Sequence, residues 1–147
     1  MATQQRVLSD LRIWADTQAP GHSTHRNLSV KELTHLADQG LIELDAHTVT
    51  HPVLATLPVT TQRDEILQSR TCIEEVLGRS VLSFAYPHGS YIQDTLAIVR
   101  DAGFSFACSS DTATVRRDSD PFRLPRISMR NWDGESFSRC LVGRLGG

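Results

Sequence analysis

The chain has 147 residues, 39% of them hydrophobic, and a formal net charge of -2. This length and composition predict one globular domain, spanning residues 1–147, with a buried core. The nearly balanced charge gives no electrostatic reason to expect nucleic acid as a partner. No apolar run reaches the roughly 18 residues of a membrane span, so we expect no such span and, for the chain as given, a cytoplasmic location.

The N-terminal part predicts two helices joined by a loop. Residues 6–16 carry apolar side chains at helical spacing, whereas residues 17–27 are rich in loop-forming residues. The second helix, within residues 28–40, has Ser29 and Glu32 in the positions of a capping box. Gly40 is expected to end it in a left-handed conformation.

Strand and helix patterns then alternate, with short connections between them. This alternation predicts an α/β fold of parallel strands linked by crossover helices. The expected strands are residues 41–44, 81–89 and 104–108, and the expected helices are 60–78 and 94–103.

The sequence also predicts helix ends, the C-terminal elements and the state of the cysteines. Thr60 or Thr61 is expected to cap its helix, with Gly78 as the stop. An edge strand at 126–129 and a last short helix near 134–145 are expected in the polar C-terminal part. Three widely spaced cysteines without a CxxC pair predict reduced, buried thiols rather than disulfides or a thiolate zinc cluster.

The segment "DAHTVTHP" follows the first expected strand and places His47 and His51 four positions apart. Imidazoles at this spacing can share one metal ion when the chain turns helically. The spacing alone favours an incidental polar turn over a metal site. The position supports a site, because α/β folds gather their chemistry at the carboxyl ends of strands. The turn "AYPHGSY" follows the next expected strand at an equivalent end.

The run from "LIELDAHTVTHP" through "SFAYPHGSY" to "AGFSFACSS" and "FRLPRI" resembles the polysaccharide deacetylases of the NodB-homology class, carbohydrate esterase family four. The resemblance covers roughly residues 27–137, with residues 1–26 as an added helix and loop. It implies a partial or irregular (β/α) barrel. It also implies a hydrolase that removes the acetyl group from N-acetylated amino sugars, acting on a carbon-nitrogen bond other than a peptide bond.

The resemblance also implies roles for particular residues. His47 and His51 stand where the family's His-Ser/Thr-x-x-His motif binds a divalent metal, for which zinc is expected. The substrate-binding turn is expected at Tyr86, Pro87, His88 and Gly89, where the family's tyrosine backbone N-H holds the oxyanion. His88 occupies that tyrosine's place, so only its backbone role carries over. With such a metal, bound water would attack the amide.

The family's Asp-Asp motif, which supplies the general base and a third metal ligand, does not occur in these 147 residues. We therefore assign no catalytic residue and expect an incomplete active site, as in the C-terminal portion of a deacetylase. Asp45 and His88 are weaker candidates for a further ligand, and Asp45 serves equally well as a turn residue. Tyr86, Tyr91 and Trp132 could stack on a sugar, but core packing or an ordinary surface ring is the simpler interpretation for each. Arg126 matches a recurrent family position, which a structural ion pair explains as well as a substrate contact. Solvation is the simplest interpretation for His22, His25 and His35.

A barrel without its first strands leaves a sheet edge that must be covered. Residues 1–26 or a second copy of the chain in a homodimer are the two covers that we expect. The leading functional hypothesis is a metal-dependent polysaccharide deacetylase acting on N-acetylated carbohydrate. The alternative is a non-catalytic remnant of that fold, which binds metal or carbohydrate.

Overall fold

The computed structural model describes residues 2–16 and 26–145. The chain divides into two compact units, Met1–Leu33 and Thr34–Gly147, which are described separately. Helix α2 (Val30–Asp38) begins in the first unit and ends in the second. None of the helices in the described ranges has the length and apolar character needed to cross a membrane.

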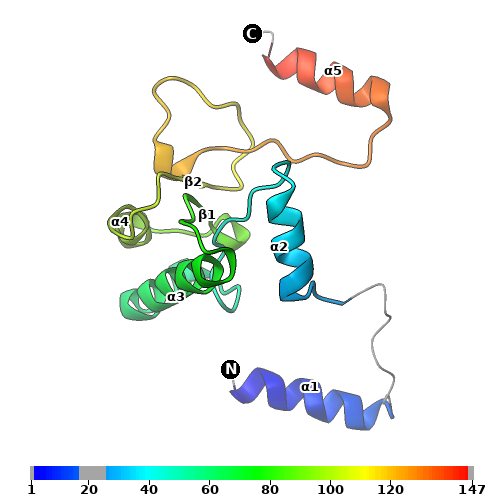
Figure 1. The fold of residues 1–147 in the computed structure, drawn as a ribbon, viewed down its shortest axis with the longest axis vertical. Helices are drawn as coiled ribbons and strands as arrows, with labels where there is room; N and C mark the ends of the chain where they lie inside the picture. The colour runs from blue at the N-terminus through cyan, green and yellow to red at the C-terminus, as the bar shows by residue number, and fades with distance from the viewer. Residues whose placement is uncertain (1, 17–25, 146–147) are drawn as a thin grey trace. The chain divides into compact units, whose positions relative to one another are not determined.

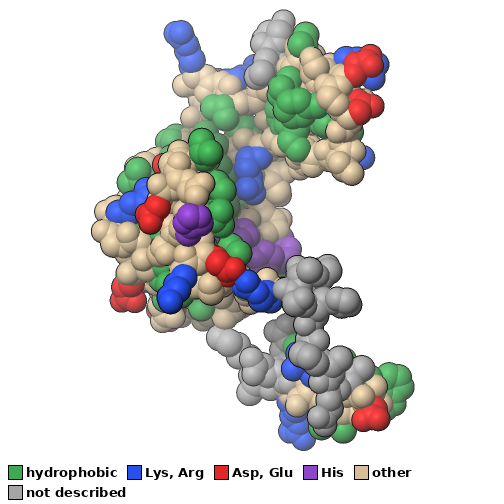
Figure 2. Space-filling view, turned by 45° about the vertical axis from the view of Figure 1, so that its right-hand side comes forward, with side chains coloured by type: hydrophobic (Ala, Val, Ile, Leu, Met, Phe, Trp, Pro, Cys, Tyr) green, Lys and Arg blue, Asp and Glu red, His purple; other side chains and the backbone are tan. Residues whose placement is uncertain are grey.

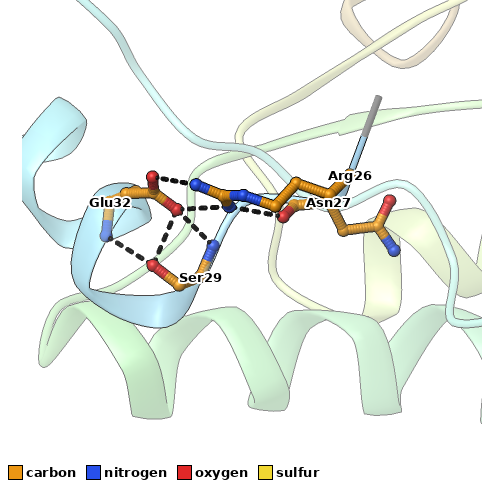
Figure 3. A network of polar contacts seen from close by, with 4 residues as sticks. All are labelled: Arg26, Asn27, Ser29 and Glu32. Atoms are coloured by element: carbon orange, nitrogen blue, oxygen red, sulfur yellow. Dashed lines mark hydrogen bonds and ion pairs between the residues drawn. The ribbon is translucent and has the colours of Figure 1, made fainter. Parts of the chain in front are cut away.

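The first unit contains helix α1 (Ala2–Trp14) and the start of α2 (Figure 1). The predicted capping box is present, since the Ser29 backbone N-H donates to Glu32 (2.8 Å) and the Glu32 N-H donates to the Ser29 hydroxyl (3.3 Å). Arg26 adds two hydrogen bonds to the same carboxylate (Figure 3). These bonds lower the pKa of Glu32, with the Arg26 hydrogen bond as the largest cause. The predicted start of α2 is therefore confirmed.

The second unit is built on a small parallel sheet. Strand β1 (Ser83–Ala85) pairs with β2 (Phe106–Cys108), and Phe84 lies opposite Ala107. Single parallel bridges extend the sheet on both sides, from Ala46 to Phe84 and from Leu124 to Cys108. The predicted α/β class with parallel strands is confirmed, whereas a closed barrel is not seen in the described part of the chain.

Two predicted strands are wrong. Residues 41–44 form no strand; Leu41 and Ile42 are exposed, and the pairing shifts to Ala46. Residues 126–129 also form no strand, because the pairing with β2 occurs earlier, at Leu124. In both cases local hydrophobicity marked the right neighbourhood but not the residue at which the sheet offers a partner.

Three longer helices belong to the second unit: α3 (Val59–Leu77), α4 (Gln93–Asp101) and α5 (Gly134–Leu145). Gly78 ends α3 in the left-handed region at φ 65°, as predicted. The predicted threonine caps are wrong, since Pro58 occupies the N-cap position and α3 begins at Val59.

The core lies on the face of the sheet that carries Phe84 and Ala107. Both are almost completely buried, at 1% and 0% exposure. Side chains of α3 and α4 complete the same cluster, namely Ile66 of α3 and Leu96, Ile98 and Val99 of α4. This packing fixes the carboxyl ends of the strands, from which the candidate site is built.

The three cysteines are free thiols, as the spacing predicted. The expectation that they are buried is wrong, because Cys72 is exposed and Cys108 and Cys140 are half-buried. Burial raises the pKa of the Cys108 thiol, against a lowering effect of Arg126 and with a smaller raising effect of Asp45.

Candidate functional site

Residues 47–51, here called the histidine loop, follow directly after Ala46. The Ala46 N-H donates to the Ser83 carbonyl (3.2 Å), and the Ala46 carbonyl accepts from the Ala85 N-H (3.0 Å). Ala46 is therefore fixed to β1, and His47 is the first residue beyond this pairing. The loop thus begins at the carboxyl end of its row of the sheet, where the sequence placed it.

The His47 ring is held by a backbone group of the neighbouring strand. Its Nδ1 lies 2.7 Å from the Ala85 carbonyl oxygen. A carbonyl oxygen can only accept, so Nδ1 carries the proton and donates it. In the neutral ring, Nε2 is then the unprotonated nitrogen, with its lone pair available to a ligand.

Three histidine rings form a continuous row at the surface. The ring centroids of His47 and His51 are 4.9 Å apart, and those of His51 and His88 are 4.6 Å apart, both in edge-to-face arrangement. All three side chains are exposed, and Figure 2 shows histidine side chains gathered in a surface patch. The structure thus brings together His47 and His51 from the predicted pair and His88 from the predicted turn.

Glu65 of α3 holds the middle of the histidine loop. Its carboxylate accepts hydrogen bonds from the backbone N-H groups of Val49 (2.8 Å) and Thr50 (2.9 Å) and from the Thr50 hydroxyl (2.6 Å). The sequence analysis missed this contact, because nothing local connects Glu65 with residues 15 or 16 positions earlier.

The second part of the site, here called the proline turn, consists of residues 86–90. It contains the short 3-10 helix η2 (Pro87–Gly89), closed by hydrogen bonds from Gly89 N-H to Tyr86 O and from Ser90 N-H to Pro87 O. Within the described ranges, the His88 N-H has no hydrogen-bond acceptor. This backbone donor lies in the same residue as the third ring of the histidine row.

The backbone of the site is unusual at three non-glycine residues. Thr48, His51 and His88 have φ values of 62°, 56° and 58°. These lie in the left-handed region, which is unfavourable for a β-branched residue such as Thr48. Their concentration in the two segments of the site indicates that the surrounding contacts impose the conformation.

Tyr86 does not present its side chain at this surface. It is 1% exposed, its hydroxyl donates to the Phe122 carbonyl (2.8 Å), and its ring packs 4.9 Å from that of Tyr91. Burial raises the pKa of Tyr86 well above its ordinary value. Pro87 is buried as well, so side-chain contact with a ligand at this turn is open to His88 and not to Tyr86 or Pro87.

The weaker candidates have separate surroundings. Asp45 is exposed. The Arg126 Nε donates to the Ser109 carbonyl (2.8 Å), which gives Arg126 a structural role. His35 of α2 pairs with Gln39, just beyond the end of that helix (3.0 Å), and Trp132 is half-buried. His22 and His25 lie outside the described residues.

The donor chemistry of the histidine loop fits a divalent metal only in part. His47 and His51 provide two exposed imidazoles, with Nε2 of His47 free to coordinate. Among residues 2–16 and 26–145, no group of three or more His, Cys, Asp or Glu side chains is arranged to hold a metal ion. The described residues therefore offer two exposed imidazoles and no complete set of metal ligands.

Comparison with known proteins defines the class. The family model described as polysaccharide deacetylase matches residues 12–107. The chain belongs to the polysaccharide deacetylase family. The resemblance seen in the sequence is therefore confirmed. No curated protein matches the chain.

Solved structures of this class share the fold. The deacetylase PplD of Streptococcus pyogenes, solved in complex with acetate, is 23% identical with a TM-score of 0.72, and the match covers 80% of this chain and 52% of PplD. IcaB from Ammonifex degensii is 23% identical with a TM-score of 0.66, over 78% of this chain and 52% of IcaB. The chain spans about half the length of these structures.

A family pseudoenzyme from Bacillus anthracis, BA3943, is also similar. It is 26% identical with a TM-score of 0.50, and the match covers 53% of this chain and 27% of BA3943. The fold thus occurs in proteins described as deacetylases and in one described as a pseudoenzyme. Whether this chain takes part in catalysis depends on its site residues rather than on its fold.

Proposed function

We propose that this chain carries the histidine side of a metal-dependent deacetylase site that hydrolyses the N-acetyl group of amino sugars in a carbohydrate substrate. His47 and His51 hold the divalent metal, for which zinc is the expected ion, and the proline turn binds the substrate. The observation that carries the proposal is the Nδ1 contact of His47 with Ala85, which leaves Nε2 free beside the His51 ring.

The spacing of the two rings supports shared coordination. Two imidazoles bound to one tetrahedral zinc ion, with Zn-N distances of about 2.1 Å, have ring centroids about 5 Å apart. The observed separation of 4.9 Å matches this arrangement. The carbonyl partner of His47 is the kind of outer contact that orients metal-binding histidines.

The metal, when bound, would activate a water molecule and polarise the acetyl carbonyl. The His88 N-H donor is suited to stabilise negative charge on that oxygen, because it makes no hydrogen bond within the described ranges. The described residues of the site include no Asp or Glu assigned as the general base, so we propose an incomplete active site that requires a carboxylate from elsewhere.

Metal binding tests the proposal directly. Isothermal titration with Zn²⁺ is expected to show one site in the wild-type chain, lost in the His47→Ala and His51→Ala variants. The His35→Ala variant is the matched control, because His35 is exposed but lies on α2 and pairs with Gln39. A folded wild-type chain that binds no Zn²⁺ would refute the proposal.

Acetate release from N-acetylglucosamine oligomers then separates the enzyme from the alternative. Release that requires His47 supports a deacetylase. Zinc or oligomer binding without release supports the non-catalytic remnant.

We also propose that a second copy of the chain covers the outer side of the sheet at Ala46, the residue that is bridged to β1. Both backbone groups of Ala46 point towards β1, so those of its neighbours Asp45 and His47 face the opposite side in an extended chain. Both neighbours are exposed. Light scattering is expected to give the mass of a dimer, and a monomer at all concentrations would exclude this arrangement.

A further inference from the structure

We propose that Glu65 is a positioning residue for metal binding. Its carboxylate holds the histidine loop in the shape that brings the His47 and His51 rings together. This inference rests on the proposed function, since it assigns a role toward the same metal. Glu65 itself points to the backbone of the loop and not to the rings, so it acts through the two histidines.

The Glu65 carboxylate can fix the backbone conformation of the histidine loop. One carboxylate oxygen accepts from two successive N-H groups, those of Val49 and Thr50, and the other oxygen accepts from the Thr50 hydroxyl. Val49 and Thr50 are two of the three residues between the histidines, so this anchor holds the segment that connects His47 with His51.

Apart from Glu65, the loop is held from outside at its first residue, where the His47 Nδ1 donates to the Ala85 carbonyl (2.7 Å). His51 N-H donates to the Thr48 hydroxyl (3.1 Å), which is a contact within the loop. In the part of the chain that the structure describes, Glu65 is the only residue outside the loop that forms hydrogen bonds with residues 48–51. The loop's connection to the rigid helix α3 is therefore a single side chain.

The backbone conformation of the loop requires such support. Thr48 and His51, on either side of the anchored residues, have φ values of 62° and 56°. A loop with two non-glycine residues in the left-handed region relaxes to other conformations unless external contacts hold it. Without the carboxylate, metal binding must itself order the loop to bring the two rings together. The entropic cost of this ordering weakens the affinity for the metal.

The test uses Zn²⁺ titration of the full chain with three variants. Glu65→Ala is expected to weaken Zn²⁺ binding by about tenfold, as loss of an outer partner of a metal site does. Glu65→Gln is expected to restore affinity to within about threefold of wild type, because its amide oxygen can accept both N-H bonds while its NH₂ donates to Thr50. Asp64→Ala, at the exposed neighbouring carboxylate of α3, is expected to leave affinity unchanged.

Thr50→Val offers a milder variant if Glu65→Ala does not fold, since it removes only the hydroxyl contact of 2.6 Å. An affinity about threefold weaker is expected for this variant. Unchanged affinity in folded Glu65→Ala, or in Thr50→Val where the first variant does not fold, would overturn the inference. A Glu65→Gln variant as weak as Glu65→Ala would also overturn it, because the negative charge and not the hydrogen-bond geometry would then be responsible.

Hydrogen exchange in the metal-free chain separates this inference from the proposed function. The Val49 and Thr50 amides are expected to exchange at least tenfold faster in Glu65→Ala than in wild type, because they lose their acceptor. If wild type binds no Zn²⁺, the proposed function fails and the exchange rates alone decide whether Glu65 holds the loop. Equal exchange rates in the two proteins would show that it does not.

Discussion

The histidine loop and the proline turn follow neighbouring parallel rows of one sheet, but they are held in different ways. In the described part of the chain, residues 48–51 of the loop are anchored by one side chain, Glu65, whereas the turn is closed by its own backbone hydrogen bonds and begins at the buried Tyr86. Changes in the turn should therefore affect folding. Changes at the anchor of the loop should mainly affect the affinity for a ligand.

The largest effect on stability is expected at Gly89, where φ is +64° and an added Cβ would clash with the Ser110 hydroxyl and lie 2.9 Å from the Ser110 Cβ and 3.1 Å from its backbone nitrogen. Gly89→Ala combines left-handed strain with overpacking and should lower the free energy of unfolding by about 3 kcal/mol. Urea denaturation measures this loss.

Gly78→Ala is the matched control, because Gly78 has φ +65° but nothing within 4 Å of the added Cβ. It should cost only about 1 kcal/mol, from the backbone conformation alone. Equal losses in the two variants would contradict tight packing of the proline turn against Ser110.

A smaller loss is expected at Tyr86, whose hydroxyl donates to the Phe122 carbonyl at 2.8 Å. Tyr86→Phe removes this buried bond and should lower the free energy of unfolding by about 1 kcal/mol near neutral pH. Tyr91→Phe is the control, since the Tyr91 hydroxyl reaches Asp111 only at 3.5 Å and should contribute less. A larger loss for Tyr91→Phe would show that the turn does not depend on the core beneath it.

Alkaline pH should further distinguish wild type from Tyr86→Phe. Burial raises the pKa of Tyr86 in the folded chain, so the unfolded chain loses this proton first as pH rises. The stability that depends on a protonated Tyr86 is fully present below about pH 10, the ordinary pKa of tyrosine, and is lost as the pH rises above it. Tyr86→Phe should therefore show a weaker fall in unfolding free energy above this pH than wild type. Identical alkaline profiles would place the Tyr86 hydroxyl in solvent.

The smallest effect is expected in the histidine loop, at Thr48. This β-branched residue has φ 62°, a region that asparagine tolerates better. Thr48→Asn should raise the free energy of unfolding by about 0.5 kcal/mol, because its side-chain oxygen can still accept from a nearby backbone N-H. Thr71→Asn, in the regular helix α3, should be nearly neutral. A loss of stability in Thr48→Asn would show that the threonine itself supports the loop.

Local patterns predicted much of the fold. The capping box at Ser29 and Glu32 and the helix end at Gly78 were confirmed, because both depend on residues a few positions apart. The strands at 41–44 and 126–129 were wrong, since strand formation depends on a partner elsewhere in the chain. The extent of the sheet therefore followed from pairing with β1 and β2 and not from local hydrophobicity.

The candidate site, too, was predicted from the sequence only in part. The spacing of His47 and His51 and the "YPHG" turn were visible in the sequence, as was the family to which the chain belongs. The sequence did not reveal that His88 meets His51 or that Glu65 reaches Val49 and Thr50. Those contacts join residues 15 to 37 positions apart, and only the packing of α3 and β1 sets their distances.

The sequence by itself determined the chemical groups, the α/β alternation and the family, because these depend on residue types and short-range order. The tertiary structure alone decided which nitrogen of His47 is free, which side chain anchors the loop and which tyrosine is buried. Each of these depends on a backbone carbonyl, a carboxylate or a core position brought close by folding, and no local pattern encodes such a distance.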